Sequence, residues 1–171
     1  MSLTQLVFWT FSALAVVGAA MCITRRSPVA SALWLVQTLF SLAALFVVLD
    51  AQFIAVLQVL VYAGAIMVLF LFVIMLLNLG RAGPSDLKGP AGLAVATLLG
   101  GLLFFQLLRG ATPSAAGTRG GNVMAQLQEE QGIVGAVARP LFSQYLIPFE
   151  ITSVLLLAAI VGAVVLAKRK L

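Results

Sequence analysis

Hydrophobic residues occur in five long runs that are separated by short groups of polar, charged and turn-forming residues. Within each run the apolarity is continuous rather than alternating, which is typical of membrane-spanning helices and not of barrel strands. Each run approaches or exceeds the roughly 20 helical residues that cross a hydrocarbon core of about 30 Å. The pattern predicts an all-α integral membrane protein with five transmembrane helices, at about 3–23, 29–49, 51–79, 91–108 and 148–167.

The only sizeable polar region lies between the fourth and fifth runs. Turn-forming residues such as Pro113 stand near its start, and weak amphipathic character over 122–137 allows a short surface helix. We therefore expect a single membrane domain over residues 1–171, with an outer loop at 109–147.

Composition supports the same protein class. Hydrophobic residues make up 63% of the 171 residues and charged residues only 9%, whereas a soluble domain carries about 25% charged residues. From Ser27 to Gly80 the only charged residue is Asp50. Such a stretch cannot form a water-facing surface, so the sequence excludes a soluble domain.

The positive charges lie between the apolar runs or at their ends, as the positive-inside rule predicts for a membrane protein. This placement, without a basic face, argues against a nucleic-acid partner despite the net charge of +5. One side of the membrane receives seven Lys and Arg residues and the other three, so we expect the N-terminus outside and the C-terminus inside. The seven are Arg25, Arg26, Arg81, Lys88, Lys168, Arg169 and Lys170, and the three are Arg109, Arg119 and Arg139.

The first run has no basic residues before it and ends at Arg25 and Arg26. These features favour a retained helix over a cleaved signal peptide. No transit peptide precedes the run, so we expect a multi-pass protein of the bacterial inner (plasma) membrane.

Residue counts restrict the chemistry of the isolated chain. The sequence has no His and one Cys, Cys22, which excludes an internal disulfide, and also a zinc site or iron–sulfur cluster carried by this chain alone. No Gly-rich phosphate loop follows a strand pattern, and no nucleophile has a His to activate it. We expect neither catalytic nor metal-binding residues in this chain.

Two acidic residues are expected at helix ends. Asp50 can serve as the N-cap of a helix that begins at Ala51, and Glu150 lies in the first turn if Pro148 is the first helical residue. The alternative for both is a carboxylate at the mouth of a proton or water path. No Lys, Asp or Glu falls at the middle of a predicted span, which argues against a proton pump acting alone.

The third run is too long for a straight transmembrane helix. Residues 51–79 would give roughly 43 Å of helix against about 30 Å of hydrocarbon. Tilt alone would have to reach about 45°, which is beyond the usual range. The run is therefore expected to project beyond the core, bend, or contain an irregularity such as a π-bulge.

Residues near the middle of this run favour such a change. Gly64 weakens a helix by about 1 kcal/mol relative to Ala, and it stands between Ala63 and Ala65. Gln58 and Tyr62 lie four residues apart on one face and can bond to each other, to a neighbouring helix or to water. The structural alternative is that the small residues pack and the tyrosine joins two helices.

The second run also carries polar residues, namely Gln37, Thr38 and Ser41. They indicate that one face of this helix is turned toward protein rather than lipid.

Three segments carry a resemblance to a known family. They are PVASAL at 28–33, FIAVLQVLVYAGAIMVLFLFVIMLLN at 53–78 and LFSQYLIPFEITSVLLLAAIVGAVVLA at 141–167. Together they resemble subunit J of bacterial NADH:quinone oxidoreductase, respiratory complex I, which is similar to mitochondrial NADH dehydrogenase chain 6. The block at 61–78 is highly specific, whereas residues 81–140 match in pattern only.

The resemblance implies a non-catalytic membrane-arm subunit of a proton-translocating enzyme. NADH, FMN, iron–sulfur clusters and quinone would be bound by other subunits and no cofactor by this chain. Its neighbours would be the quinone-site and antiporter-like subunits.

The resemblance also implies a site in the third helix. In the family this helix carries a π-bulge near the tyrosine that corresponds to Tyr62, and its change between α and π forms is linked to a water path. The positions carried over are Tyr62, Gly64, Met67 and Val68, with Gln58 preceding them. Alternatives are a subunit of a related cation/proton antiporter or membrane hydrogenase, or a subunit that only packs its neighbours together.

Overall fold

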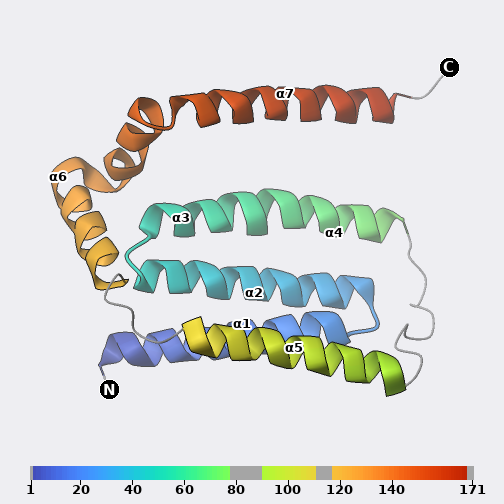
Figure 1. Cartoon of the computed structure of the whole chain (residues 1–171). Coiled ribbons are helices and arrows are strands. Elements are labelled where there is room, and N and C mark those ends of the chain that lie inside the picture. Colours follow the sequence, from blue (N-terminus) through green and yellow to red (C-terminus); the bar gives the residue numbers. More distant parts are fainter. Residues whose placement is uncertain (1, 78–89, 111–116, 169–171) are drawn as a thin grey trace. The chain divides into compact units, whose positions relative to one another are not determined.

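The computed structural model describes residues 2–77, 90–110 and 117–168 (Figure 1). All regular elements in these residues are helices, which confirms the all-α fold. They are α1 Leu3–Thr24, α2 Pro28–Val48, α3 Gln52–Leu57, the π-helix η1 Gln58–Ile66, α4 Met67–Leu76, α5 Pro90–Gly110, α6 Gly117–Ser143 and α7 Leu146–Ala167.

Four helices in the described residues are long and apolar enough to cross a membrane. Three of them, α1, α2 and α7, begin and end within two residues of predicted spans. The fourth is the continuous helix Gln52–Leu76, formed by α3, η1 and α4 and here called the third helix. α5 occupies the remaining predicted span, but its apolar described part, Val95–Gly110, is shorter. The fifth crossing and the orientation of the termini stay predictions.

Local sequence explains where the first two helices begin. Ser2 caps α1 in a capping box, because its hydroxyl accepts the Gln5 N–H at 3.4 Å and the Gln5 side chain accepts the Ser2 N–H at 3.3 Å. α2 begins at Pro28, whose fixed φ and missing N–H suit the first helical position.

α2 is the central helix of the packed region. It packs against α1 and against all three parts of the third helix (Figure 1). Small residues predominate at these contacts and let the backbones approach closely. The buried residues of α1, α2 and the third helix are Ala15, Gly18, Ala32, Thr38, Ser41, Ala43, Ala55, Ala63, Met67 and Ile74.

The hydroxyl groups buried on α2 are satisfied by its own backbone. Thr38 Oγ1 donates to the Trp34 carbonyl at 2.9 Å, and Ser41 Oγ donates to the Gln37 carbonyl at 3.0 Å. These bonds remove the cost of placing a hydroxyl in an apolar contact.

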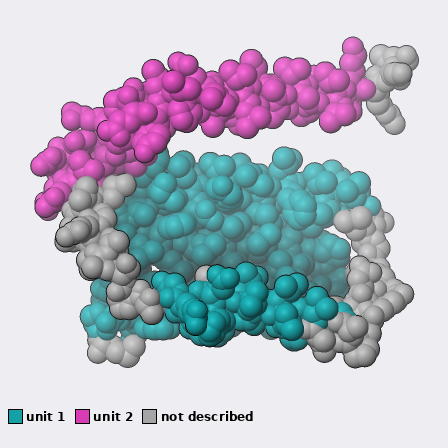
Figure 2. Space-filling view, viewed as in Figure 1, with its two compact units in different colours: residues 1–122 teal, residues 123–171 magenta. Residues whose placement is uncertain are grey.

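The described structure divides into two compact units, Met1–Asn122 and Val123–Leu171 (Figure 2). In the second unit, Phe142 at the end of α6 meets Phe149 in α7 edge to face, with ring centroids 5.1 Å apart. The single domain over 1–171 stays a prediction.

The region predicted as an outer loop is helical over most of its length, because α6 extends well beyond the short helix expected at 122–137. Gly132 interrupts α6 with φ 75° and ψ 165°, a conformation that is essentially restricted to glycine. Helix-forming residues on both sides of this kink explain why two helical segments replace the expected loop.

Gly18 provides a test of the contact between α1 and α2. A Cβ added there would lie 2.6 Å from Thr38 Oγ1. We expect Gly18→Ala to destabilise the protein by about 1–3 kcal/mol through overpacking, measured as thermal unfolding in detergent. Adding Thr38→Ala should recover part of this loss, since it removes the obstructing atom. An equal loss with or without Thr38 would contradict this contact.

Candidate functional site in the third helix

The third helix contains an irregularity, which is one of the three outcomes that its excess length allows. It runs from Gln52 to Leu76, and residues 78 and 79 of the predicted span lie outside the described residues. Its middle, η1, is a π-helix of nine residues, Gln58–Ile66. Most π-helices are single-turn bulges and they occur frequently at functional sites. The length of η1 therefore marks this segment as the candidate site.

The backbone hydrogen bonds show how η1 joins the α-helical parts. At its C-terminal end the Met67 N–H donates to the Tyr62 carbonyl, five residues back. At its N-terminal end the Gln58 N–H is shared between the carbonyls of Ile54 and Ala55. The chain thus passes from α to π and back to α without a break in the helix.

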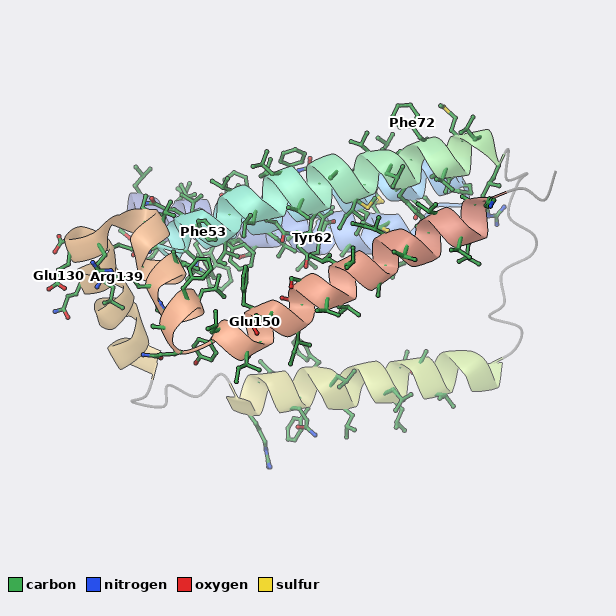
Figure 3. The ribbon with its side chains drawn as sticks, turned by 90° about the horizontal axis from the view of Figure 1, so that it is seen from above. Phe53, Tyr62, Phe72, Glu130, Arg139 and Glu150 are labelled. Atoms are coloured by element: carbon green, nitrogen blue, oxygen red, sulfur yellow. The ribbon has the colours of Figure 1, made fainter. Side chains whose placement is uncertain are left out.

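Four predicted site residues take different positions on this helix. Gln58 is the first residue of η1 and is half-buried. Tyr62 lies near the centre of η1 with 53% of its surface exposed, and Figure 3 shows it between Phe53 and Phe72 along the helix. Met67 is buried in the core with Ala32 and Ile74, whereas its neighbour Val68 is exposed.

No side-chain hydrogen bond joins Gln58 to Tyr62 in the part of the chain that the structure describes. Of the three partners that the sequence allows for these groups, a neighbouring helix and water remain.

Gly64 has one close neighbour within its own helix. A Cβ at this position would stand 3.1 Å from the carbonyl oxygen of Val59, which is tighter than most real contacts of a Cβ. Val59 is five residues earlier, so the contact belongs to the π geometry. The missing side chain of Gly64 therefore suits the π form.

η1 is weakly packed. Ala63 is its only buried residue, while Leu60, Val61, Tyr62 and Ile66 are exposed. An apolar groove of about 510 Å³ lies between α2 and the start of the third helix, and Val59 and Leu60 help to line it. Few neighbouring side chains therefore oppose a change in the shape of η1.

The sequence suggested that Asp50 is the N-cap of the third helix, but the structure places it elsewhere. The helix begins at Gln52, and its N-cap is Ala51. Asp50 instead has φ 58° and follows the end of α2. Its N–H donates to the Val47 carbonyl at 3.1 Å, and the Ala51 N–H donates to the Phe46 carbonyl at 2.9 Å. These two bonds form a Schellman motif that ends α2.

Glu150 is not in the first turn of α7. The helix begins at Leu146, two residues before Pro148, and its first turn holds no acidic residue. The helix dipole favours anions mainly within the first turn, so the predicted stabilisation is lost. The Glu150 side chain is exposed, and its alternative role at a proton or water path stays a prediction.

The sequence matches the family model described as NADH-ubiquinone/plastoquinone oxidoreductase chain 6 over residues 18–166. This match covers all four of the apolar helices at least in part. The chain belongs to that family.

Curated relatives agree with the family assignment. The chain is 39% identical to NAD(P)H-quinone oxidoreductase subunit 6 of the Paulinella chromatophora chromatophore, over 98% of this chain and 80% of that protein. It is 37% identical to NADH-quinone oxidoreductase subunit J of Pseudomonas aeruginosa, over 96% and 97% respectively. It is also 33% identical to F(420)H(2) dehydrogenase subunit J of Methanosarcina mazei, over 98% and 92%.

Sequence reasoning missed two features of this chain 6 family member. It did not anticipate that the Val59 carbonyl would stand 3.1 Å from a Cβ at Gly64, because this neighbour depends on the helix geometry. It also did not assign the positive φ of Asp50, although Asp tolerates this region better than most residues. The signal was present as an Asp directly between two apolar runs, a position that suits a helix end as well as a helix start.

The Schellman motif predicts how Asp50 responds to substitution. Asp50→Gly should be better tolerated than a β-branched residue, because glycine adopts a positive φ freely. Asp50→Val should reduce it by about 1–2 kcal/mol, the cost of the left-handed region. Thermal unfolding in detergent measures both. Equal stability of the two variants would show that the backbone conformation at Asp50 is not what this turn requires.

Proposed function

We propose that this chain is a membrane-arm subunit of a proton-translocating NADH:quinone oxidoreductase and that η1 helps couple quinone reduction to proton movement. NADH, FMN, iron–sulfur clusters and quinone are bound by other subunits, and this chain contributes no catalytic group. Its neighbours are the quinone-site and antiporter-like subunits of a bacterial inner membrane complex. The observation that carries the proposal is the nine-residue π-helix around Tyr62.

The proposed motion is a change of η1 between π and α forms. Moving the hydrogen-bond register by one residue turns the following residues by about 100°, because an α-helix has 3.6 residues per turn. Ala55 on one side of η1 and Met67 on the other are buried. The change therefore also turns Met67 and the rest of α4 relative to Ala55.

Tyr62 is the polar group that such a rotation moves. Its side chain is exposed at the centre of η1, and a phenol hydroxyl both donates and accepts hydrogen bonds. In one form the hydroxyl binds water and extends a hydrated path, and in the other it turns away. The chain itself need not carry a proton, which agrees with the lack of mid-span acids.

Gly64→Leu tests the gating step. The added side chain crowds the Val59 carbonyl in the π form and removes the helix weakness of glycine, worth about 1 kcal/mol. A bias of that size shifts the balance of two forms about fivefold. We expect a lower proton yield per quinone reduced, measured in vesicles that contain the complex.

Gly162→Leu is the matched control, since a Cβ at Gly162 in α7 meets no atom within 4 Å. It should leave the proton yield unchanged. Normal quinone reduction and a normal proton yield in the Gly64→Leu complex would contradict the gating proposal. η1 would then only pack against its neighbours.

Tyr62→Phe tests the hydroxyl separately from the ring. Loss of one hydrogen bond, worth about 1 kcal/mol, should lower the occupancy of a bound water about fivefold. We expect slower proton transfer in an intact complex, measured as proton uptake by vesicles alongside the amount of assembled complex. Reduced assembly with an unaltered yield per complex would instead assign the hydroxyl to packing between helices.

A second candidate is a complex that takes electrons from a donor other than NADH. The relative from Methanosarcina mazei, named as a subunit of an F(420)H(2) dehydrogenase, favours this alternative. Gentle extraction of the tagged chain, identification of the copurifying subunits and an NADH:quinone activity assay separate the two. Copurifying flavin and iron–sulfur subunits without NADH-dependent activity would support the second donor.

A further inference from the structure

Gln37 differs from the other polar residues on α2. Thr38 and Ser41 are buried and donate to carbonyls of their own helix. Gln37 is exposed, and its side chain has no hydrogen bond in the described part of the chain. A carboxamide offers two N–H donors and one acceptor oxygen, so all of this capacity is unused.

The position of Gln37 makes the unused capacity costly. It is the tenth of the 21 residues of α2. At 1.5 Å per residue it lies about 14 Å from one end of the helix and about 17 Å from the other. This is close to the centre of a hydrocarbon core of about 30 Å. Lipid headgroups do not reach that depth, and acyl chains cannot form hydrogen bonds.

The surroundings of Gln37 form a place where another helix can lie. Gln37 and Trp34 of α2 line a groove of about 390 Å³ together with Leu33 and with Leu14 and Val17 of α1. The Trp34 indole N–H is a second donor near Gln37, and it too has no hydrogen bond among the described residues. Two donors and an amide oxygen in an apolar groove favour a ligand that brings an oxygen acceptor.

Near their middle, α7 and α5 carry few side-chain acceptors. From Val154 to Ala167, α7 has no polar side chain. The hydroxyls of Thr152 and Ser153 lie nearer its start, within the first eight of its 22 residues. In α5 the polar side chains nearest the middle are Thr97 and Gln106, three and six residues from the central Gly100. The acceptor is therefore expected from outside the chain.

We infer that the groove around Gln37 is the contact site for a transmembrane helix of another subunit of the same complex. That helix places a side-chain oxygen, from Ser, Thr, Asn, Gln or a carboxyl group, opposite Gln37 at mid-membrane depth. The inference needs the chain to be a complex subunit, as family membership indicates, but it does not depend on gating by η1.

Gln37→Leu tests the contact in the assembled complex. If lipid faced Gln37, this more apolar side chain would be harmless or favourable to the membrane protein. If a partner oxygen faces it, the variant leaves that oxygen unpaired. We expect the subunits that copurify with the tagged chain to fall about three- to twentyfold, the range that corresponds to interhelical hydrogen bonds in membranes.

Two further variants serve as controls for Gln37→Leu. Gln37→Asn keeps the amide and should recover part of the assembly. Gln106→Leu makes the same change near the end of α5 and should have little effect. Unchanged copurification in the Gln37→Leu complex would overturn the inference.

A photoreactive residue at Leu33, which is 55% exposed in the same groove, identifies the partner. Irradiation of native membranes should link the chain to a transmembrane peptide of another subunit. Adducts only with lipid, or only with another helix of this chain, would overturn the inference. Failure of the gating proposal is distinguishable, because Gly64→Leu would then pump normally while the Leu33 adduct still formed.

Discussion

Every backbone N–H and carbonyl within the hydrocarbon must find a partner inside the protein, and this constraint governs the third helix. An open kink would expose unpaired groups at a cost of several kcal/mol each. η1 avoids this cost by bonding five residues back instead of four, as the Met67 N–H to Tyr62 carbonyl bond shows. The helix therefore stays closed while its geometry departs from the α form. A π-helix is thus an irregularity that a membrane allows.

This geometry divides the third helix into held and free parts. Ala55, Ala63 and Met67 are buried and fix the helix to its neighbours, whereas most of η1 is exposed. Ala55 and Ala63 have small side chains, which let the helix backbones approach closely without interlocking side chains. A segment with few packed neighbours rearranges at a low cost in free energy. The candidate site, η1, is therefore in the part of the third helix with the fewest buried residues.

The sequence predicted most of what depends on long-range apolarity and little of what depends on single-residue geometry. Continuous runs place α1, α2 and α7 almost to the residue, because burial in lipid depends on the whole run. Excess length pointed to an irregular third helix, while its assignment near Tyr62 came from the resemblance to a family. Asp50 and Glu150 were assigned wrongly, because shifts of one or two residues at a helix boundary cost little and leave no pattern. The helical α6 was underestimated for a related reason, since a glycine kink at Gly132 separates two segments that each lack strong periodicity.

Two kinds of polar side chain in the apolar helices differ in how their hydrogen bonds are satisfied. Hydroxyls such as Thr38 and Ser41 are satisfied within their own helix and allow close packing. The larger side chains of Gln37, Gln58 and Tyr62 have no side-chain hydrogen bond among the described residues. In water such groups would need no explanation, but in hydrocarbon each requires a partner or a water molecule. Since Gln37 lines the groove with α1 while Gln58 and Tyr62 stand on the third helix, α2 separates two unsatisfied regions. Anything that binds either region stabilises the folded chain by mass action, which links the stability of the chain to its assembly.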